Sequence, residues 1–328
     1  MKSVNIGIIG LGGMGKRHLQ NCQYLKDAKL VAVADPSKQA RSMAERAGVK
    51  YVYSDYLKLL ENEQVDCVIV SVPTFLHAEC SVAAAEHGKG ILLEKPIAGN
   101  VTDGREIIIK ARKNSVKVMM GYPLRFSPEF RQLRTSVRSG VLGDVIVANA
   151  VNVSSGPFAY VTDQAIPKPV SSWWLERNLS GGGALLDLGC HMINLLRWYF
   201  GDDVTITRAV LQHRFHLDVE DFAIVFLSFR NGPVATIESG WFSLSSDLEI
   251  ELFGTAGIER ARGREISTAM RVMNILKKKP PSWNRVFFDE LVYFTDCVRK
   301  DIAPSPSCED GLKDLEVISL AYKNQEVL

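Results

Sequence analysis

The sequence predicts an α/β protein with two domains: a doubly wound parallel sheet, followed by an α+β domain with an open, largely antiparallel sheet. In the first 121 residues, short apolar runs alternate with helical stretches, which is typical of a parallel sheet covered on both faces. Between residues 204 and 253, strand-like runs follow one another without helices, which indicates antiparallel pairing. We therefore expect domains at residues 1–121 and 122–328.

The composition is that of an ordinary globular protein, and 328 residues are enough for two domains. Thirty-nine Lys and Arg residues nearly balance 37 Asp and Glu residues, so we expect no nucleic acid and no anionic membrane as partner. No apolar run reaches the roughly 18 residues of a membrane span. Six scattered cysteines without a C-x-x-C pair indicate a reducing compartment, so we expect a cytoplasmic protein.

The first domain is expected to alternate strand and helix throughout. A strand at 4–9 precedes a helix in which Leu19, Cys22 and Leu25 recur at helical spacing. Further strands are expected at 30–34, 50–53, 66–71, 90–94 and 116–120. Further helices are expected at 37–47, 55–61, 75–88 and 101–114.

The segment between the first strand and the first helix reads G-L-G-G-M-G. Gly10 permits a tight turn, Gly12 lets the backbone approach a pyrophosphate, and Gly15 lets helix and strand pack closely. The helix N-terminus supplies unpaired N–H groups for phosphates. Asp35 ends the second strand, 20 residues after Gly15, where a carboxylate accepts hydrogen bonds from ribose hydroxyls. This context favours a Rossmann dinucleotide site over an ordinary glycine-rich turn.

Asp35 also indicates which dinucleotide binds. A carboxylate at this position repels a 2′-phosphate, which favours NAD over NADP. Lys38 and Arg41 lie close by in the sequence and soften that preference. The expected cofactor is NAD.

Two further segments, Ser71–Thr74 and Glu94–Pro96, lie at the carboxyl ends of predicted parallel strands, where such sheets bind ligands. Lys95 is either an ordinary solvated lysine or a group that donates to a substrate hydroxyl and stabilises alkoxide charge. Its position alone does not decide between these. The residues expected to contact the cofactor are Gly10, Gly12, Gly13, Met14, Gly15, Asp35, Ser71, Pro73, Thr74, His77, Glu94 and Lys95.

The segment 181–196 starts with three glycines and is then apolar apart from three polar side chains. Asp187, His191 and Asn194 are spaced i, i+4 and i+7, so they share one face of a predicted helix. An unpaired buried polar side chain costs about 1–3 kcal/mol, so this stripe must meet partners, water or a ligand. Structural hydrogen bonding to a sheet is one alternative. A metal site is another, but no third ligand is nearby, and no metal is expected.

The second domain is expected to begin near Gly121. Its first elements are a helix at 127–138, a strand at 144–154 and a loop at 155–172 able to cover a site. Asn231 and Gly232 form a tight hairpin signal. The remaining expected elements are a helix at 184–199, strands at 204–213, 220–229, 233–242 and 247–253, and helices at 282–299 and 309–325.

Four segments together resemble the glucose-fructose oxidoreductase, inositol dehydrogenase and rhizopine catabolism protein (Gfo/Idh/MocA) family. They are G-L-G-G-M-G at 10–15, the stretch containing E-K-P at 72–99, G-Y-P-L-R-F-S-P at 121–128 and the stretch containing G-G-G-A-L-L-D-L-G-C-H at 172–201. They occur in family order. The rest of the chain resembles the family only in its strand pattern and terminal helices.

The resemblance implies NAD(P)-dependent oxidation or reduction of a hydroxyl group on a sugar, an inositol or a nucleotide-sugar. It also implies a cis Lys95–Pro96 bond and a homodimer or homotetramer formed through the second sheet. The residues to which it gives catalytic roles are Lys95, Asp187 and His191. Those to which it gives substrate contacts are Tyr122, Arg125, Trp173, Asp187 and His191.

These residues suggest one mechanism. His191 takes the hydroxyl proton as hydride leaves, Lys95 stabilises the partial alkoxide, and Asp187 binds a neighbouring substrate hydroxyl. The alternative is a non-catalytic NAD-binding sensor or co-regulator on the same scaffold, which would not need the three residues together. Among enzymes, a free polyol or sugar competes with a UDP-linked sugar as substrate, and the sequence leaves that choice open.

Overall fold

The computed structural model describes residues 3–161, 164–167, 171–230, 232–243, 246–263 and 285–327. The chain forms two compact units. The first comprises residues 1–98, 102–126 and 265–311, and the second comprises residues 99–101, 127–264 and 312–328. Among the described residues, no helix has the combination of length and apolar character that a membrane span requires.

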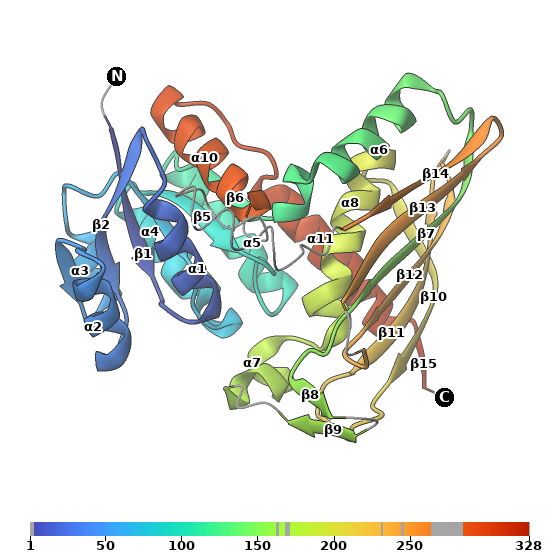
Figure 1. Ribbon diagram of the computed structural model, residues 1–328, viewed down its shortest axis with the longest axis horizontal. Coiled ribbons are helices and arrows are strands. Elements are labelled where there is room, and N and C mark those ends of the chain that lie inside the picture. The colour runs from blue at the N-terminus through green and yellow to red at the C-terminus, as the bar shows by residue number, and fades with distance from the viewer. Residues whose placement is uncertain are drawn as a thin grey trace. The chain divides into compact units, whose positions relative to one another are not determined.

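The first unit is built on a six-stranded parallel sheet with the strand order β3-β2-β1-β4-β5-β6 (Figure 1). Its strands are β1 (Val4–Ile9), β2 (Ala28–Ala34), β3 (Tyr51–Tyr53), β4 (Cys67–Val70), β5 (Gly90–Glu94) and β6 (Val118–Gly121). The connecting helices are α1 (Gly13–Cys22), α2 (Lys38–Arg46), α3 (Tyr56–Leu60), η1 (Thr74–Leu76), α4 (His77–Glu86) and α5 (Val101–Lys113). The strand order reverses between β1 and β4, which is where such sheets bind dinucleotides. The predicted doubly wound parallel sheet is confirmed.

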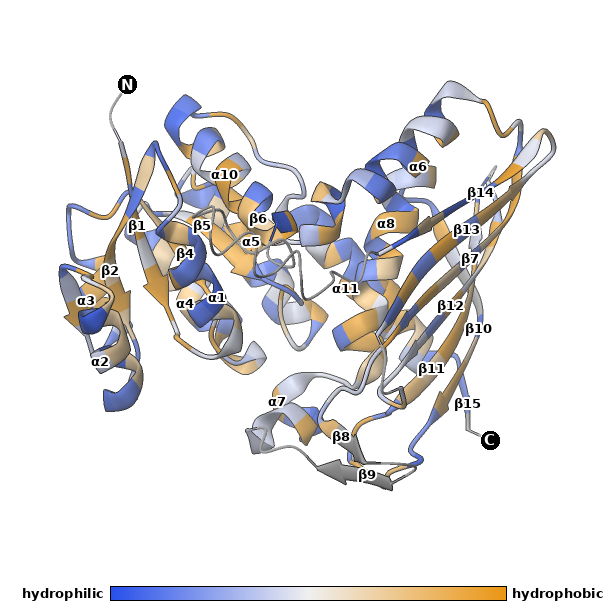
Figure 2. Cartoon of the chain, in the orientation of Figure 1, coloured by the Kyte–Doolittle hydropathy of each residue, from blue (hydrophilic) through white to orange (hydrophobic). Residues whose placement is uncertain are grey.

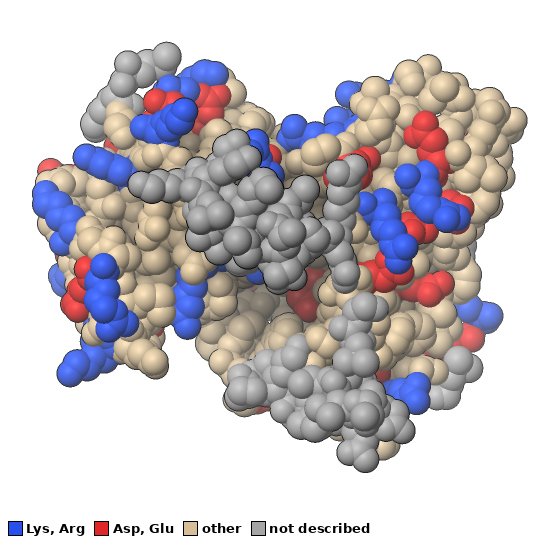
Figure 3. Space-filling view, in the orientation of Figure 1, with Lys and Arg blue, Asp and Glu red and all other residues tan. Residues whose placement is uncertain are grey.

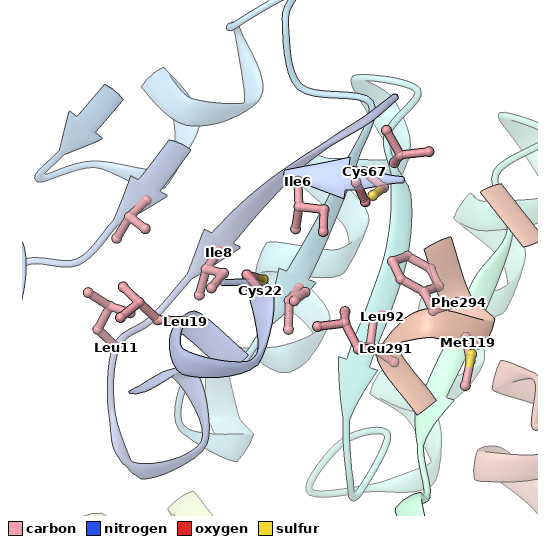
Figure 4. Packing of buried hydrophobic residues seen from close by; sticks show 14 of the residues in the cluster. Ile6, Ile8, Leu11, Leu19, Cys22, Cys67, Leu92, Met119, Leu291 and Phe294 are labelled. Carbon is pink, nitrogen blue, oxygen red and sulfur yellow. The ribbon is translucent and has the colours of Figure 1, made fainter. Parts of the chain in front are cut away.

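The strands of the first unit are mostly hydrophobic (Figure 2). All residues of β4 are buried, and β1 buries every residue except Asn5. Figure 4 shows Ile6 and Ile8 of β1 near Leu19 and Cys22 of α1, in one buried cluster. Because a central parallel strand is covered on both faces, it needs an unbroken apolar run rather than an alternating one.

Helix α10 (Arg285–Lys300) comes from the C-terminal part of the chain but belongs to the first unit. Its Leu291 and Phe294 are buried beside Leu92 of β5 and Met119 of β6 (Figure 4). The expected boundary at Gly121 placed this helix in the second domain, and the structure differs from that division. The apolar face of α10 marks it as a packed helix, but nothing local in the sequence shows which sheet it covers.

The second unit is built on a seven-stranded sheet with the strand order β14-β13-β7-β12-β11-β10-β15. The pairs β7–β12 and β10–β15 are parallel, and the others are antiparallel. The strands are β7 (Val145–Val153), β10 (Val204–Gln212), β11 (Phe222–Phe229), β12 (Val234–Gly240), β13 (Asp247–Gly254), β14 (Gly257–Arg262) and β15 (Gln325–Val327). The predicted open, largely antiparallel sheet is confirmed.

Helices α6 (Pro128–Ser139) and α8 (Cys190–Phe200) lie on one face of this sheet, and no described helix lies on the other (Figure 1). Residues of β11 accordingly alternate between buried and half-buried, with Val225 and Leu227 buried and Ile224 and Phe226 half-buried. Basic and acidic side chains are intermixed on the face of the molecule shown in Figure 3.

Several strands of the second unit were not predicted. β8 (Phe158–Val161) and β9 (Gln164–Pro167) pair as a small antiparallel hairpin, so the loop expected at 155–172 is wrong in this part. β14 and β15 were also missed. The hairpin between β11 and β12 is confirmed by their antiparallel pairing, although Asn231 itself lies outside the described residues. These strands are short, and β9 ends in a proline, which weakens the sequence signal for a strand.

A buried polar network joins α8 to α11 (Cys308–Lys323). The side chains of Arg197 and Asp314 form an ion pair in which each exposes only 1% of its surface. Asn194 donates a hydrogen bond of 2.6 Å to the other carboxylate oxygen of Asp314. At the edge of the network, the half-exposed Asp202 accepts from Arg197 and from Lys313, each at 2.6 Å. This network fixes the two helices against each other.

We expect Asp314→Ala to lower the free energy of unfolding by about 3–5 kcal/mol, because it leaves the Arg197 guanidinium buried without its main counter-ion. Lys313→Ala is the control, since it removes an exposed ion pair and should cost at most about 1 kcal/mol. Urea unfolding of both variants measures the difference. Equal losses would contradict the importance of burial here.

Candidate functional site

The shape of the glycine loop in the first unit depends on a close approach between Gly10 and Gly15. Gly10 has a φ of +90°, and a Cβ placed on Gly15 would lie 2.0 Å from the Gly10 carbonyl oxygen. The Ser71 hydroxyl donates to the same carbonyl at 2.8 Å. A Cβ on Gly12 or Gly13, by contrast, would meet no atom within 4 Å. The loop is therefore tight on its protein side and open on its outer side, which suits a bound pyrophosphate.

Asp35 lies beside this loop at the end of β2. Its carboxylate accepts hydrogen bonds from the Leu11 amide at 2.6 Å and from the Ser37 amide at 2.8 Å. The Arg41 guanidinium donates to the carbonyl oxygens of Asp35 and Pro36, both at 2.8 Å. The backbone thus holds the carboxylate next to the glycine loop, where it can meet a ribose.

The ends of β4 and β5 are linked by a buried histidine. His77 places Nδ1 2.7 Å from the Pro96 carbonyl oxygen and Nε2 3.1 Å from the Val72 carbonyl oxygen. Burial lowers the pKa of His77, and the two carbonyls partly oppose that effect. Sequence reasoning placed His77 at the cofactor, whereas in the structure its ring nitrogens join Ser71–Thr74 to the E-K-P segment. Thr74, at the start of η1, is also buried.

The two residues of the E-K-P motif that matter for chemistry differ in exposure. Glu94 is buried, and its Oε1 lies 2.7 Å from His18 Nε2 of α1. Lys95 is half-buried, and the Lys95–Pro96 peptide bond is cis, as the resemblance implied. The Glu94 side chain thus serves the interior of the first unit, while Lys95 is the accessible cation at this strand end.

Two predicted substrate residues lie just after β6. Tyr122 is buried, and Arg125 is buried in η2 (Pro123–Phe126). The Arg125 guanidinium lies 3.4 Å from a carboxylate oxygen of Asp310 and 3.4 Å from the Ser305 hydroxyl. Arg125 therefore has structural partners from the C-terminal part of the first unit, which the sequence did not indicate.

In the second unit, Asp187 lies in a π-helical turn, η4 (Leu185–Gly189), and His191 follows in the first turn of α8. Both side chains are half-buried. The indole N–H of Trp241, a fully buried residue just after β12, donates to Asp187 Oδ2 at 3.2 Å. An acid and an imidazole are thus presented together from an otherwise apolar helix. π-turns of this kind often occur at functional sites.

The third member of the predicted polar stripe lies elsewhere. Asn194 is 1% exposed and donates to Asp314 of α11, so it belongs to the buried network rather than to the face of Asp187 and His191. Asn194 is thus committed to a structural partner, although it lies only three residues after His191 in α8. The π turn contains Asp187 and precedes both His191 and Asn194, so it changes the spacing of Asp187 relative to the other two residues.

The entry into this helix is fixed by a buried carboxylate. Oε1 of Glu220 accepts from the Gly183 and Leu185 amides, both at 3.0 Å, and from the Tyr322 hydroxyl at 2.8 Å. A Cβ on Gly183 would lie 1.9 Å from the Glu220 carbonyl oxygen, so this position requires glycine. Burial raises the pKa of Glu220, although the Tyr322 hydroxyl and the two amides counteract it.

An aromatic cluster surrounds this end of the second unit. Trp173 is half-buried in η3 (Ser172–Leu175), and its neighbour Trp174 packs against Trp241 with 5.4 Å between ring centroids. Sequence reasoning singled out Trp173 but missed Trp241 and Glu220. Glu220 could have been noticed as an acid at the head of an apolar strand, whereas nothing local marked Trp241. No group of three His, Cys, Asp or Glu residues within the described ranges is arranged to hold a metal ion.

Comparison with known proteins agrees with both units. Residues 4–122 match the family model "Oxidoreductase family, NAD-binding Rossmann fold", and residues 130–259 match "GFO/IDH/MocA C-terminal domain". A myo-inositol 2-dehydrogenase of Thermotoga maritima is 28% identical over 98% of this chain and 96% of its own length. A scyllo-inositol 2-dehydrogenase (NAD(+)) of Bacillus subtilis is 26% identical over 96% and 92%. The crystal structure of a probable dehydrogenase from Thermotoga maritima aligns with a TM-score of 0.83 and 27% identity, over 98% and 96%.

We expect Gly12→Ala to impair NADH binding and Gly15→Ala to impair stability. Gly12→Ala should fold normally but bind NADH at least about tenfold more weakly, because its methyl group would occupy the space of the pyrophosphate. Gly15→Ala should cost about 1–3 kcal/mol of stability or more, because its methyl group would collide with the Gly10 carbonyl. Urea unfolding and NADH fluorescence titration separate the two effects. Normal NADH affinity in Gly12→Ala would contradict the assignment of the loop.

Proposed function

The chain belongs to the Gfo/Idh/MocA oxidoreductase family, and from this premise we propose that it is an NAD-dependent dehydrogenase of a cyclic polyol or sugar. The observation that carries the proposal is the half-buried pair of Asp187 and His191. Trp241 donates a hydrogen bond to the Asp187 carboxylate, and Glu220 accepts from an amide at the start of the helix that carries both residues. An acid beside an imidazole suits a substrate with adjacent hydroxyl groups, one to bind and one to lose its proton. An inositol is the favoured substrate, because two relatives that match nearly the whole chain are named for inositols.

We propose NAD rather than NADP as the cofactor. The Asp35 carboxylate is fixed beside the glycine loop by two amides, so its charge cannot easily move away from a 2′-phosphate. Of the two nearby cations that softened this expectation, Lys38 and Arg41, Arg41 already donates to two backbone carbonyls. We propose that the Asp35 carboxylate, which is fixed at the glycine loop itself, outweighs the attraction of these cations.

The proposed mechanism divides the work among three residues. Bound NAD supplies the hydride acceptor. His191 accepts the proton of the reacting hydroxyl, and Lys95 stabilises the negative charge that develops on its oxygen. Asp187 accepts a hydrogen bond from a neighbouring substrate hydroxyl, and the Trp241 indole keeps its carboxylate oriented.

We also propose that the protein forms a homodimer or homotetramer through the second sheet. The face of that sheet without a described helix exposes or half-exposes apolar residues on neighbouring strands, among them Ile224 and Phe226 of β11. Surfaces of this kind are typical of protein–protein interfaces.

The proposed function is tested by an activity screen followed by two substitutions. Inositols, aldoses, anhydro-sugars and UDP-sugars are offered with NAD and with NADP. We expect the cofactor to be reduced fastest when NAD is combined with an inositol. Lys95→Ala and His191→Ala should each lower turnover at least about a hundredfold while NADH still binds, because each removes a group that acts in the transition state. Near-normal turnover in either variant would refute its assigned role. Tight NAD binding without turnover of any compound would favour a sensor or co-regulator.

We expect Trp241→Phe to lower kcat about tenfold or more with little change in the Kd for NADH. The substitution keeps an aromatic ring in the core but removes the N–H group that donates to Asp187. Trp174→Phe is the matched control, because it alters the same aromatic pair without touching that hydrogen bond. Steady-state kinetics with the substrate found in the screen measures both variants. Equal kcat losses would show that packing, not the hydrogen bond, is responsible.

A further inference from the structure

A buried acid of the first unit has no role in the proposed mechanism. Glu290 lies on α10, and none of its surface is exposed. Neither of its carboxylate oxygens has a well-formed hydrogen bond to a described residue, although the backbone N–H of Tyr122 lies close enough to lower its pKa in part. A buried carboxylate in this position is costly, so the groups around it must explain why the chain tolerates it.

The main titratable neighbour of Glu290 is Glu94, the first residue of the E-K-P motif. Two side chains of α1 interact with the Glu94 carboxylate. His18 contacts its Oε1, and the half-buried Arg17 guanidinium lies close enough to interact with its charge. Arg125, on the neighbouring turn η2, is engaged with Asp310 instead. Strand β1, which also packs against α10, contributes no titratable group.

The group formed by Arg17, His18, Glu94 and Glu290 can stabilise one negative charge, whereas a second charge would carry a large desolvation cost. Arg17 and His18 both lie on α1 and act on Glu94, whereas Glu290 forms no ion pair among the described residues. Burial and, after it, the negative charge of Glu94 raise the pKa of Glu290 well above its usual range. When two carboxyl groups are buried next to each other, one commonly ionises while the other keeps its proton.

We propose that Glu290 is a protonated carboxylic acid in the native protein and that Glu290 and His18 are positioning residues for the E-K-P segment. His18 holds the Glu94 carboxylate from α1, and the neutral Glu290 is buried close to Glu94 on α10. Because Lys95 follows Glu94 directly, this cluster fixes the backbone from which the Lys95 ammonium extends. The role of Lys95 rests on the proposed function, but the protonation of Glu290 does not.

Protonation of Glu290 has a definite effect on stability. In the unfolded chain an ordinary Glu has a pKa of about 4.3 and releases its proton above that pH. In the native state the raised pKa keeps the proton bound, so folding takes up one proton between the two pKa values. The contribution of Glu290 to stability therefore falls as pH rises above the unfolded pKa, and it stops falling only above the folded pKa.

The first test compares Glu290→Gln with the wild-type protein by urea unfolding between about pH 5 and pH 8. Gln keeps the shape of the acid but releases no proton. The ratio of the two folding equilibrium constants should rise in favour of the variant by up to about tenfold per pH unit. Asp289→Asn is the matched control, because Asp289 is one residue away on the same helix and pairs with the exposed Arg285. It should show no such rise.

A second readout needs neither unfolding nor activity. The infrared spectrum of the native protein near neutral pH should contain the carbonyl stretch of a protonated carboxylic acid, and Glu290→Gln should remove that band. A pH-independent stability difference, together with no band lost in the variant, would overturn the proposal. If Gln prevents folding, the infrared measurement is made with Glu290→Asp, in which the band should shift.

The positioning role is tested by a double-mutant cycle with NAD and myo-inositol. His18→Phe should lower kcat about tenfold, and His18→Gln, which keeps a hydrogen-bond donor, should restore part of that loss. In the Lys95→Ala background, His18→Phe should have little further effect, because its influence passes through Lys95. Additive losses would overturn the positioning role. Full activity of Lys95→Ala alone would refute the proposed function and leave the protonation of Glu290 intact.

Discussion

One buried carboxylate fixes where the helix that carries Asp187 and His191 begins. The first amides of a helix have no acceptor within the helix, and here Glu220 accepts from two of the amides at this end, those of Gly183 and Leu185. A shift of one residue along the helix would turn each side chain by about 100°, which would carry both away from a common substrate. The site therefore depends on a residue that need not touch the substrate at all.

The first unit uses the same principle with different groups. The close approach of Gly10 and Gly15 sets the loop, and His77 joins the two strand ends that follow it. In each unit the groups available for chemistry lie at the ends of strands or helices, and buried polar contacts directly behind them limit their movement. A dehydrogenase needs this arrangement, because small displacements of reacting groups have large effects on rate.

Most of the fold could be predicted because its signals are local. The unbroken apolar strands, the glycine loop and Asp35 each lie within a short segment and follow from backbone geometry alone. The partners of the site could not be predicted in the same way. Trp241 is 54 residues from Asp187, and Tyr322 is 102 residues from Glu220, so only the folded chain joins them. The partner of Asn194 could not be predicted either, since Asp314 lies 120 residues further along the chain.

Helix α10 shows why long-range packing also affects chemistry. Burying a large apolar side chain such as Leu291 or Phe294 contributes about 1.5–3 kcal/mol, and together two such residues offset the cost of placing a neutral acid beside them. An ionised Glu290 would cost far more than these two contacts supply. The proposed protonation of Glu290 lets the helix cover the parallel sheet without burying a second charge close to Glu94 and the neighbouring Lys95. Packing at the end of the chain thus sets the electrostatics of a motif nearly 200 residues earlier.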